Sequence, residues 1–138
     1  MIKPPPIIHQ KAPHWTIEHY PSIDLVIMTH PNRDQDDPGY PFLWEFISTL
    51  EDPWRYNAIF NMLDWPGVTP FAIVQEFADR FNELMGGRDV GKRSCTVDNN
   101  PVTQSRYATS SFQNLFPNRQ LQLFDNLDDA FLWATHQT

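Results

Sequence analysis

Short apolar runs suited to β-strands alternate along this chain with apolar stripes at helical spacing. The clearest stripe covers residues 70–85, where apolar residues recur every three or four positions until Gly86 and Gly87 close the helix. Strand-like runs stand on either side of it, at 56–63 and 92–97. Because parallel neighbouring strands need a connection long enough to hold a helix, this alternation predicts a mostly parallel sheet covered by helices.

The rest of the chain continues the same pattern. A hairpin is expected first, with strands at 14–20 and 23–29, and an interior parallel position is expected for 56–63. Further elements are predicted as helices at 41–50, 101–115 and 126–134 and as a strand at 120–124. The fold class is therefore α/β, in the order ββαβαβαβα: a five-stranded, mostly parallel sheet with one antiparallel edge hairpin strand and four helices. Residues 1–13 are predicted to be an extended Pro-rich lead-in, and 14–138 a single domain.

Capping chemistry supports these helix starts. Thr69 precedes Pro70, a favourable first helical residue, and is a good N-cap. Asn100 stands in the same relation to Pro101. Asn126 precedes a helix whose first turn holds two aspartates, which the positive helix start favours.

Composition excludes several classes of protein. The 138 residues are 41% hydrophobic, which is enough for a core and rules out a disordered acidic tail. Ten Lys and Arg against 17 Asp and Glu give a net charge of −7, which disfavours nucleic acid as a partner. No apolar run is long enough to span a bilayer. Three prolines interrupt the region where a secretory signal would be apolar, so we expect a cytoplasmic protein.

The C-terminal segment carries a family resemblance. Residues 119–133, RQLQLFDNLDDAFLW, resemble the closing segment of small bacterial SpoIIAA-like (STAS) proteins, in which a strand ending in Phe-Asp leads into a helix with an acidic-acidic-Ala start. The opening hairpin followed by strand–helix units is similar to the same fold. The resemblance implies a regulatory or binding domain. In its anti-sigma antagonists a Ser or Thr is phosphorylated after the central strand, and Thr69 stands there, although the family's Asp-Ser-Ser-Gly run is absent.

Ligands of parallel sheets bind beyond the carboxyl ends of the strands, in the turns that lead into helices. Three such turns are expected here, at 30–41, 64–69 and 98–101. Their candidate ligand or regulatory residues are Asp64, Thr69, Asp98, Asn99 and Asn100.

The acidic residues of these turns suggest two kinds of cation site, with a plain connector as the alternative. The Pro-rich loop at 31–41 holds Asp34, Asp36 and Asp37, but their spacing departs from that of a calcium loop. Together with Asp64 these acids also suggest the phospho-acceptor pocket of a receiver domain, which needs a lysine after the last strand; Asp125 and Asn126 stand there instead. A solvated connector is the favoured reading of the loop.

Motifs of catalysis are missing from the sequence. It contains no nucleophile elbow, phosphate loop or dinucleotide fingerprint, and its five histidines follow no zinc-binding spacing. Cys95 lies mid-strand, where a buried structural thiol is favoured over a nucleophile. No catalytic residue, metal or cofactor is predicted, and a hydrolase built on the 30–41 and 64–69 turns is kept as an alternative.

Two tryptophans, Trp44 and Trp133, fall off the apolar stripes of their helices. Interfaces favour such exposed aromatics, so both residues are candidates for a homodimer or partner surface, with the rim of the core as the alternative. The leading hypothesis is a non-catalytic module that recognises a protein partner or a small apolar ligand, and the main alternative is a switch phosphorylated at Thr69.

Overall fold

The structure is a computed structural model that describes residues 4–10, 15–30, 40–65 and 67–135. In chain order its elements are β1 (Ile7–Gln10), β2 (Thr16–Tyr20), β3 (Leu25–Thr29), α1 (Tyr40–Thr49), β4 (Asn57–Asn61), α2 (Phe71–Met85), β5 (Arg93–Val97), α3 (Pro101–Tyr107), α4 (Ser110–Gln113), β6 (Gln120–Phe124) and α5 (Leu127–Thr135).

All the described strands join one mixed sheet. Its spatial order is β1-β2-β3-β4-β5-β6, antiparallel from β1 to β3 and parallel from β3 to β6. The α/β class, the parallel majority and the antiparallel opening are confirmed. The predicted numbers of elements are wrong, since the sheet has six strands and the described residues form five helices.

The additional strand is β1, which lies within the predicted Pro-rich lead-in. Ile7 lies opposite His19 and Ile8 opposite Glu18, so β1 takes the edge position that the sequence suggested for β2. Both isoleucines are exposed, and a four-residue strand carries little periodicity of its own. Pairing with β2, a contact between separate segments, is what holds these residues extended.

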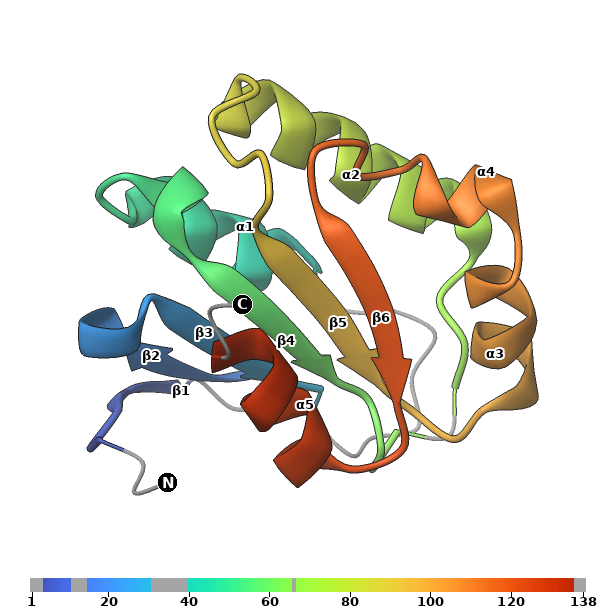
Figure 1. The fold of residues 1–138 in the computed structure, drawn as a ribbon, viewed down its shortest axis with the longest axis horizontal. Coiled ribbons are helices and arrows are strands. Elements are labelled where there is room, and N and C mark those ends of the chain that lie inside the picture. Colours follow the sequence, from blue (N-terminus) through green and yellow to red (C-terminus); the bar gives the residue numbers. More distant parts are fainter. Residues whose placement is uncertain (1–3, 11–14, 31–39, 66, 136–138) are drawn as a thin grey trace.

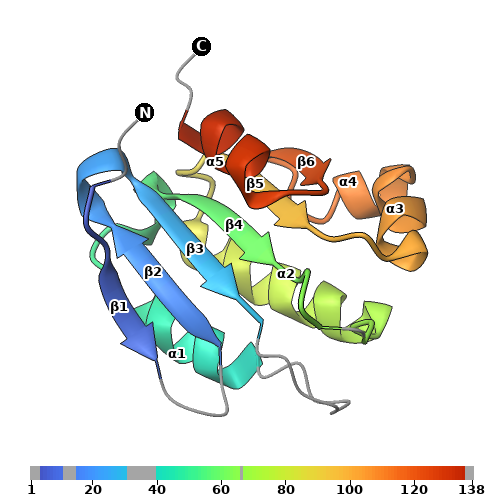
Figure 2. The ribbon, with the colours of Figure 1, turned by 90° about the horizontal axis from the view of Figure 1, so that it is seen from below.

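Helices cover the sheet on two faces. Figure 2 shows α1 and α2 below the sheet and α5 above it. Successive side chains of a strand point to opposite faces of the sheet, so one strand contributes to the core on both faces. Val26 and Met28 of β3 pack toward α1 and α2, whereas Leu25 and Ile27 pack toward α5. The central strands are therefore buried on both sides, as the apolar runs at 23–29 and 56–63 predict.

One face of β2 and of the residue before it belongs to the core. Trp15 and Ile17 are fully buried in the layer under α1 and α2. His19 shares that face, where its Nε2 lies 3.0 Å from the Tyr56 hydroxyl and its ring contacts Phe46. Burial, together with the nearby charges of His9 and Arg55, lowers the pKa of His19, so the neutral imidazole is favoured here.

The helix predicted over 101–115 is in fact two short helices. Asn100 begins α3 as predicted, with its Oδ1 accepting a hydrogen bond from the Val102 amide at 2.9 Å. A break follows at Ala108, and Thr109 caps α4 through its hydroxyl, which accepts from the Phe112 amide. Thr109 and the two serines after it favour a new helix start over continuation, and this turns α4 onto α2 (Figure 1).

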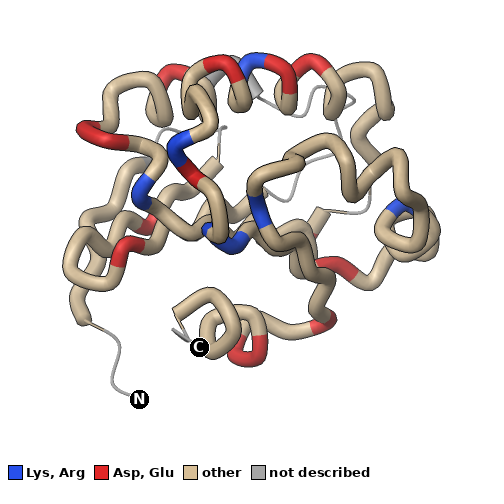
Figure 3. Tube along the Cα trace, turned by 45° about the horizontal axis from the view of Figure 1, so that its top comes forward, with Lys and Arg blue, Asp and Glu red and all other residues tan. Residues whose placement is uncertain are grey.

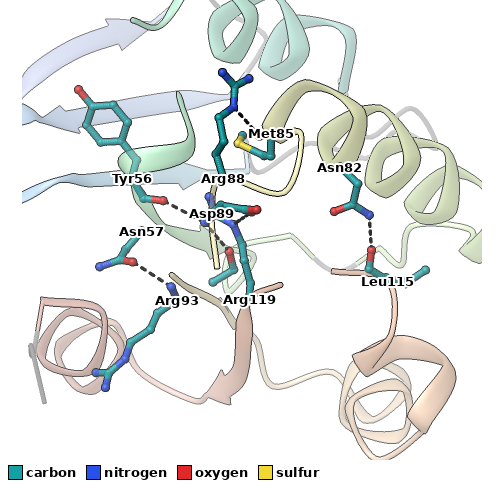
Figure 4. A network of polar contacts seen from close by, with 10 residues as sticks. Tyr56, Asn57, Asn82, Met85, Arg88, Asp89, Arg93, Leu115 and Arg119 are labelled. Carbon is teal, nitrogen blue, oxygen red and sulfur yellow. Dashed lines mark hydrogen bonds and ion pairs between the residues drawn. The ribbon is translucent and has the colours of Figure 1, made fainter. Parts of the chain in front are cut away.

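A buried ion pair ties the amino ends of the parallel strands together (Figure 4). Arg119 Nε donates to Asp89 Oδ2 at 2.6 Å, and its Nη1 donates to the Tyr56 carbonyl and the Ser94 hydroxyl. Both charged side chains are 1–2% exposed. Burial lowers the pKa of Arg119, while Asp89 favours its charged form. One guanidinium thereby connects the turn after α2 with β4, β5 and the start of β6.

None of the helices in the described part of the chain has both the length and the apolar character that crossing a membrane requires.

Candidate functional site

A pocket lies at the carboxyl edge of the sheet, where β4 and β5 end. Phe60 and Met62 line it from β4 and the residue after it, and Thr96 and Asp98 from β5 and its following turn. The N-terminal half of α2, together with α3 and α4, encloses the other sides, and Figure 1 shows these helices beside the ends of the strands. Its cavity volume is about 90 Å³, and it opens to solvent on one side. This is the edge on which the sequence placed the candidate turns.

Aromatic side chains from several parts of the chain line the pocket. Five of the residues that line it are aromatic, namely Phe60, Trp65, Phe77, Phe112 and Phe116. They come from β4, the turn after it, α2, α4 and the segment after α4. The wall is therefore built from five separate parts of the chain.

Trp65 is fixed by its neighbours. Its ring stacks on the His30 ring at 3.9 Å between centroids, and the His30 ring meets Trp15 edge-on. Gly67 passes so close to the indole that an added Cβ would lie 2.4 Å from Trp65 Cζ2. A larger residue at 67 would displace the ring, so glycine at this position sets the shape of this part of the wall.

Asp98 is the buried acid of the pocket. Its side chain is 8% exposed, and it accepts hydrogen bonds from the Asn100 amide at 3.1 Å and from the Thr103 hydroxyl at 2.7 Å. No described Lys, Arg or His lies within ion-pair distance of it. A carboxylate has about four acceptor positions, so both Asp98 oxygens retain acceptor capacity.

Thr69 lines the same pocket, but it is not the predicted helix cap. The cap position of α2 is occupied by Pro70, whose carbonyl accepts from the Ile73 and Val74 amides. The Thr69 side chain is 5% exposed, and its hydroxyl has no hydrogen-bond partner among the described residues. Pro70 is itself extended, with φ −54° and ψ 137°, so α2 begins one residue later than predicted and Thr69 lies outside the cap position.

Two further polar groups complete the lining. The Thr96 and Tyr107 hydroxyls are 2.6 Å apart, which fixes α3 against the end of β5. Arg106 of α3 is half-buried and its guanidinium lies 5.8 Å from the Phe71 ring centroid, although Phe71 itself does not line the pocket. Arg106 and Asp98 are not close enough to form an ion pair.

The remaining predicted site residues lie outside the pocket lining. Asp64 is exposed in the turn after β4, and Asn99 is exposed in the turn after β5. Asn100 acts as the cap of α3 and as a donor to Asp98. Of the five candidates, Thr69 and Asp98 line the pocket, and Asn100 contacts Asp98 from outside the lining.

Several other predictions concern residues away from the pocket. Cys95 is buried as expected, and burial raises the pKa of its thiol to about 12, so it remains protonated at neutral pH. Asp34, Asp36 and Asp37 lie outside the described residues. The described residues contain no group of three His, Cys, Asp or Glu side chains that could hold a metal ion.

The two off-stripe tryptophans are partly buried against their own chain. Trp44 contacts the Phe77 ring edge-on, and Trp133 packs on Phe124 with the Arg93 guanidinium 5.2 Å from its ring centroid. Figure 4 shows Arg93 on the strand facing α5. These contacts correspond to the core-rim alternative, and the homodimer stays a prediction.

Sequence reasoning missed the aromatic wall and Arg106. Phe60 was assigned to a strand and Phe112 to a helical stripe, but nothing in either pattern says that both line one cavity. Their convergence depends on the break between α3 and α4. The Thr-Ser-Ser run at 109–111 was the available signal for that break.

Comparison of the chain with family models, curated proteins and solved structures finds no match.

Proposed function

We propose that this chain is a small SpoIIAA-like binding module without catalytic activity, and that it recognises a small, largely apolar ligand in the pocket at the carboxyl edge of its sheet. The observation that carries the proposal is the pocket itself: an aromatic wall with a few polar groups, which is the composition of small-molecule sites. The layout of an antiparallel opening followed by strand–helix units supports the SpoIIAA-like assignment. A regulatory protein partner and a cytoplasmic location remain parts of the same proposal.

The geometry favours binding over the phosphorylated switch. A kinase needs access to the hydroxyl that it modifies, and the Thr69 side chain is almost entirely enclosed. Phosphorylation of Thr69 would require the turn before α2 to open. The hydrolase alternative has even less support, because Asp64 is exposed and does not line the pocket.

Filling the pocket tests the proposal. Val74 is a half-buried residue of α2 that lines the pocket, so Val74→Phe adds a ring where a ligand would lie. We expect fragments that raise the melting temperature of the natural protein to bind Val74→Phe about tenfold or more weakly, since the ring removes the space that they bury. The measurement is a thermal-shift screen of small apolar and amphipathic fragments, followed by calorimetric titration.

Val90→Phe is the matched control, because Val90 is 72% exposed and lies away from the pocket. It should bind the same fragments as the natural protein. If Val74→Phe does not fold, Val68→Phe replaces it, since Val68 is 37% exposed and lines the pocket from the surface. Fragments that bind the filled and natural pockets equally, or a screen without hits, would contradict the proposal.

A further inference from the structure

The Asp98 carboxylate is a buried charge for which the described residues provide no counter-ion. Its hydrogen-bond donors, the Asn100 amide and the Thr103 hydroxyl, are both neutral. Buried carboxylates in proteins are usually paired with a cation or coordinate a metal. Asp98 instead lines a pocket, where a bound molecule can approach it.

The walls around Asp98 suit a cation as well. Phe60, Phe77 and Phe112 present aromatic rings to the same cavity, together with Trp65 and Phe116. The face of an aromatic ring is the negative end of its quadrupole, so an ammonium group is attracted where it lies over such a face. A carboxylate inside an aromatic wall combines a charge-assisted acceptor with this attraction.

We propose that the pocket selects ligands with an ammonium group on an apolar body, and that Asp98 is the residue that binds the ammonium. This inference rests on the proposed function, because it names the chemical class of the ligand bound in the same pocket. The small cavity accommodates the ammonium group and the first part of the body, and the rest of the ligand lies at the open side.

Charge elsewhere in the molecule is consistent with this selection. Acidic residues outnumber basic ones, and Figure 3 shows them in many separate parts of the described chain, so the protein as a whole attracts cations. Arg106 is the opposing charge in the pocket lining. Arg106 is more exposed than Asp98, and its guanidinium lies beside Phe71, the first residue of α2, so water screens its charge more strongly.

Three probes of nearly equal size test the inference: benzylammonium, benzyl alcohol and benzoate, each titrated at pH 7 with the dissociation constant measured by protein NMR. We expect benzylammonium to bind most tightly and benzoate most weakly. In Asp98→Asn the affinity for benzylammonium should fall about tenfold or more, because a charge-assisted hydrogen bond is lost, while that for benzyl alcohol stays the same. Unchanged binding of the alcohol shows that the variant keeps its pocket.

Two further variants sharpen the experiment. Asp64→Asn makes the same change at the exposed acid outside the pocket, and it should leave the affinity for benzylammonium unaltered. Arg106→Gln removes the opposing charge and should strengthen benzylammonium binding about two- to fivefold.

The outcomes separate this inference from the proposed function. Equal binding of benzylammonium and benzyl alcohol, unaffected by Asp98→Asn, would overturn the choice of ligand class and leave the pocket as a binding site. Tightest binding of benzoate, lost in Arg106→Gln, would overturn it in favour of an anion. If no probe binds and the fragment screen is also empty, the proposed function itself fails.

Discussion

Arg119→Met is expected to lower the free energy of unfolding by about 3–5 kcal/mol, because it leaves the Asp89 carboxylate buried without its cation. Asp89 Oδ1 already lacks a hydrogen-bond partner among the described residues, so Arg119 is its main compensation. The substitution also removes the donor to the Tyr56 carbonyl. Urea denaturation at pH 7, followed by tryptophan fluorescence, measures the effect.

The exposed pair Arg55–Asp24 provides the matched control. Its separation is 2.9 Å, close to that of the buried pair, but its side chains are 43% and 40% exposed. Arg55→Met should therefore lower the free energy of unfolding far less than Arg119→Met does, because water screens the exposed pair. A second check is Asp89→Leu combined with Arg119→Met, which removes both charges and should be more stable than Arg119→Met alone. Equal losses at Arg119 and Arg55 would refute this account of the ion pair.

The second large effect is expected at Phe77. Phe77→Ala removes a buried ring that contacts Trp44, Phe60 and Phe81, and it should cost about 3–5 kcal/mol. Stabilities of domains of this kind are about 5–15 kcal/mol, so much of the total depends on this position. Thermal and urea unfolding curves, compared with those of the natural protein, give the loss.

Phe71→Ala makes the same change at the first residue of α2, six positions before Phe77. Phe71 is 38% exposed, whereas Phe77 is 7% exposed. Its truncation should cost far less, since exposed apolar area contributes little to folding. A comparable loss from both substitutions would mean that α2 does not pack on the sheet through Phe77.

The parallel part of the fold was predictable from the order of apolar residues. A helix buried on one side shows an apolar stripe, and a strand buried on both faces shows a continuous apolar run. The stripe over 70–85 corresponds to α2, and the apolar run at 56–63 contains β4, which lies between two parallel neighbours. Gly86 closes α2 with a positive φ of 58°, as expected of a glycine at that place. These features depend on local conformation and on which residues are apolar.

Features that depend on contacts between distant segments were not predictable in the same way. β1 is a strand because it pairs with β2. Ile7 and Ile8 remain exposed, so no buried face marks this strand in the sequence. The cap of α2 fell on Pro70 rather than Thr69, because Pro70 is extended (φ −54°, ψ 137°) and the helix begins at Phe71.

The candidate site was predicted in position but not in composition. Thr69 and Asp98 follow strands that end at one sheet edge, so their proximity follows from the parallel arrangement. The aromatic wall and Arg106 required the positions of α3 and α4, which are set by packing of Phe112 and Leu115 on α2. No single-segment pattern contains that information.

The central claim is that a small molecule binds where β4 and β5 end, between α2, α3 and α4. The most direct test is an NMR titration of isotope-labelled protein with the best-binding fragment, followed residue by residue through the backbone amides. The account predicts the largest saturable shifts at Thr69, Thr96 and Thr103, which line the pocket, and none near Arg119 at the opposite edge of the sheet. Saturable shifts grouped around Arg119 with none at the three threonines would contradict it.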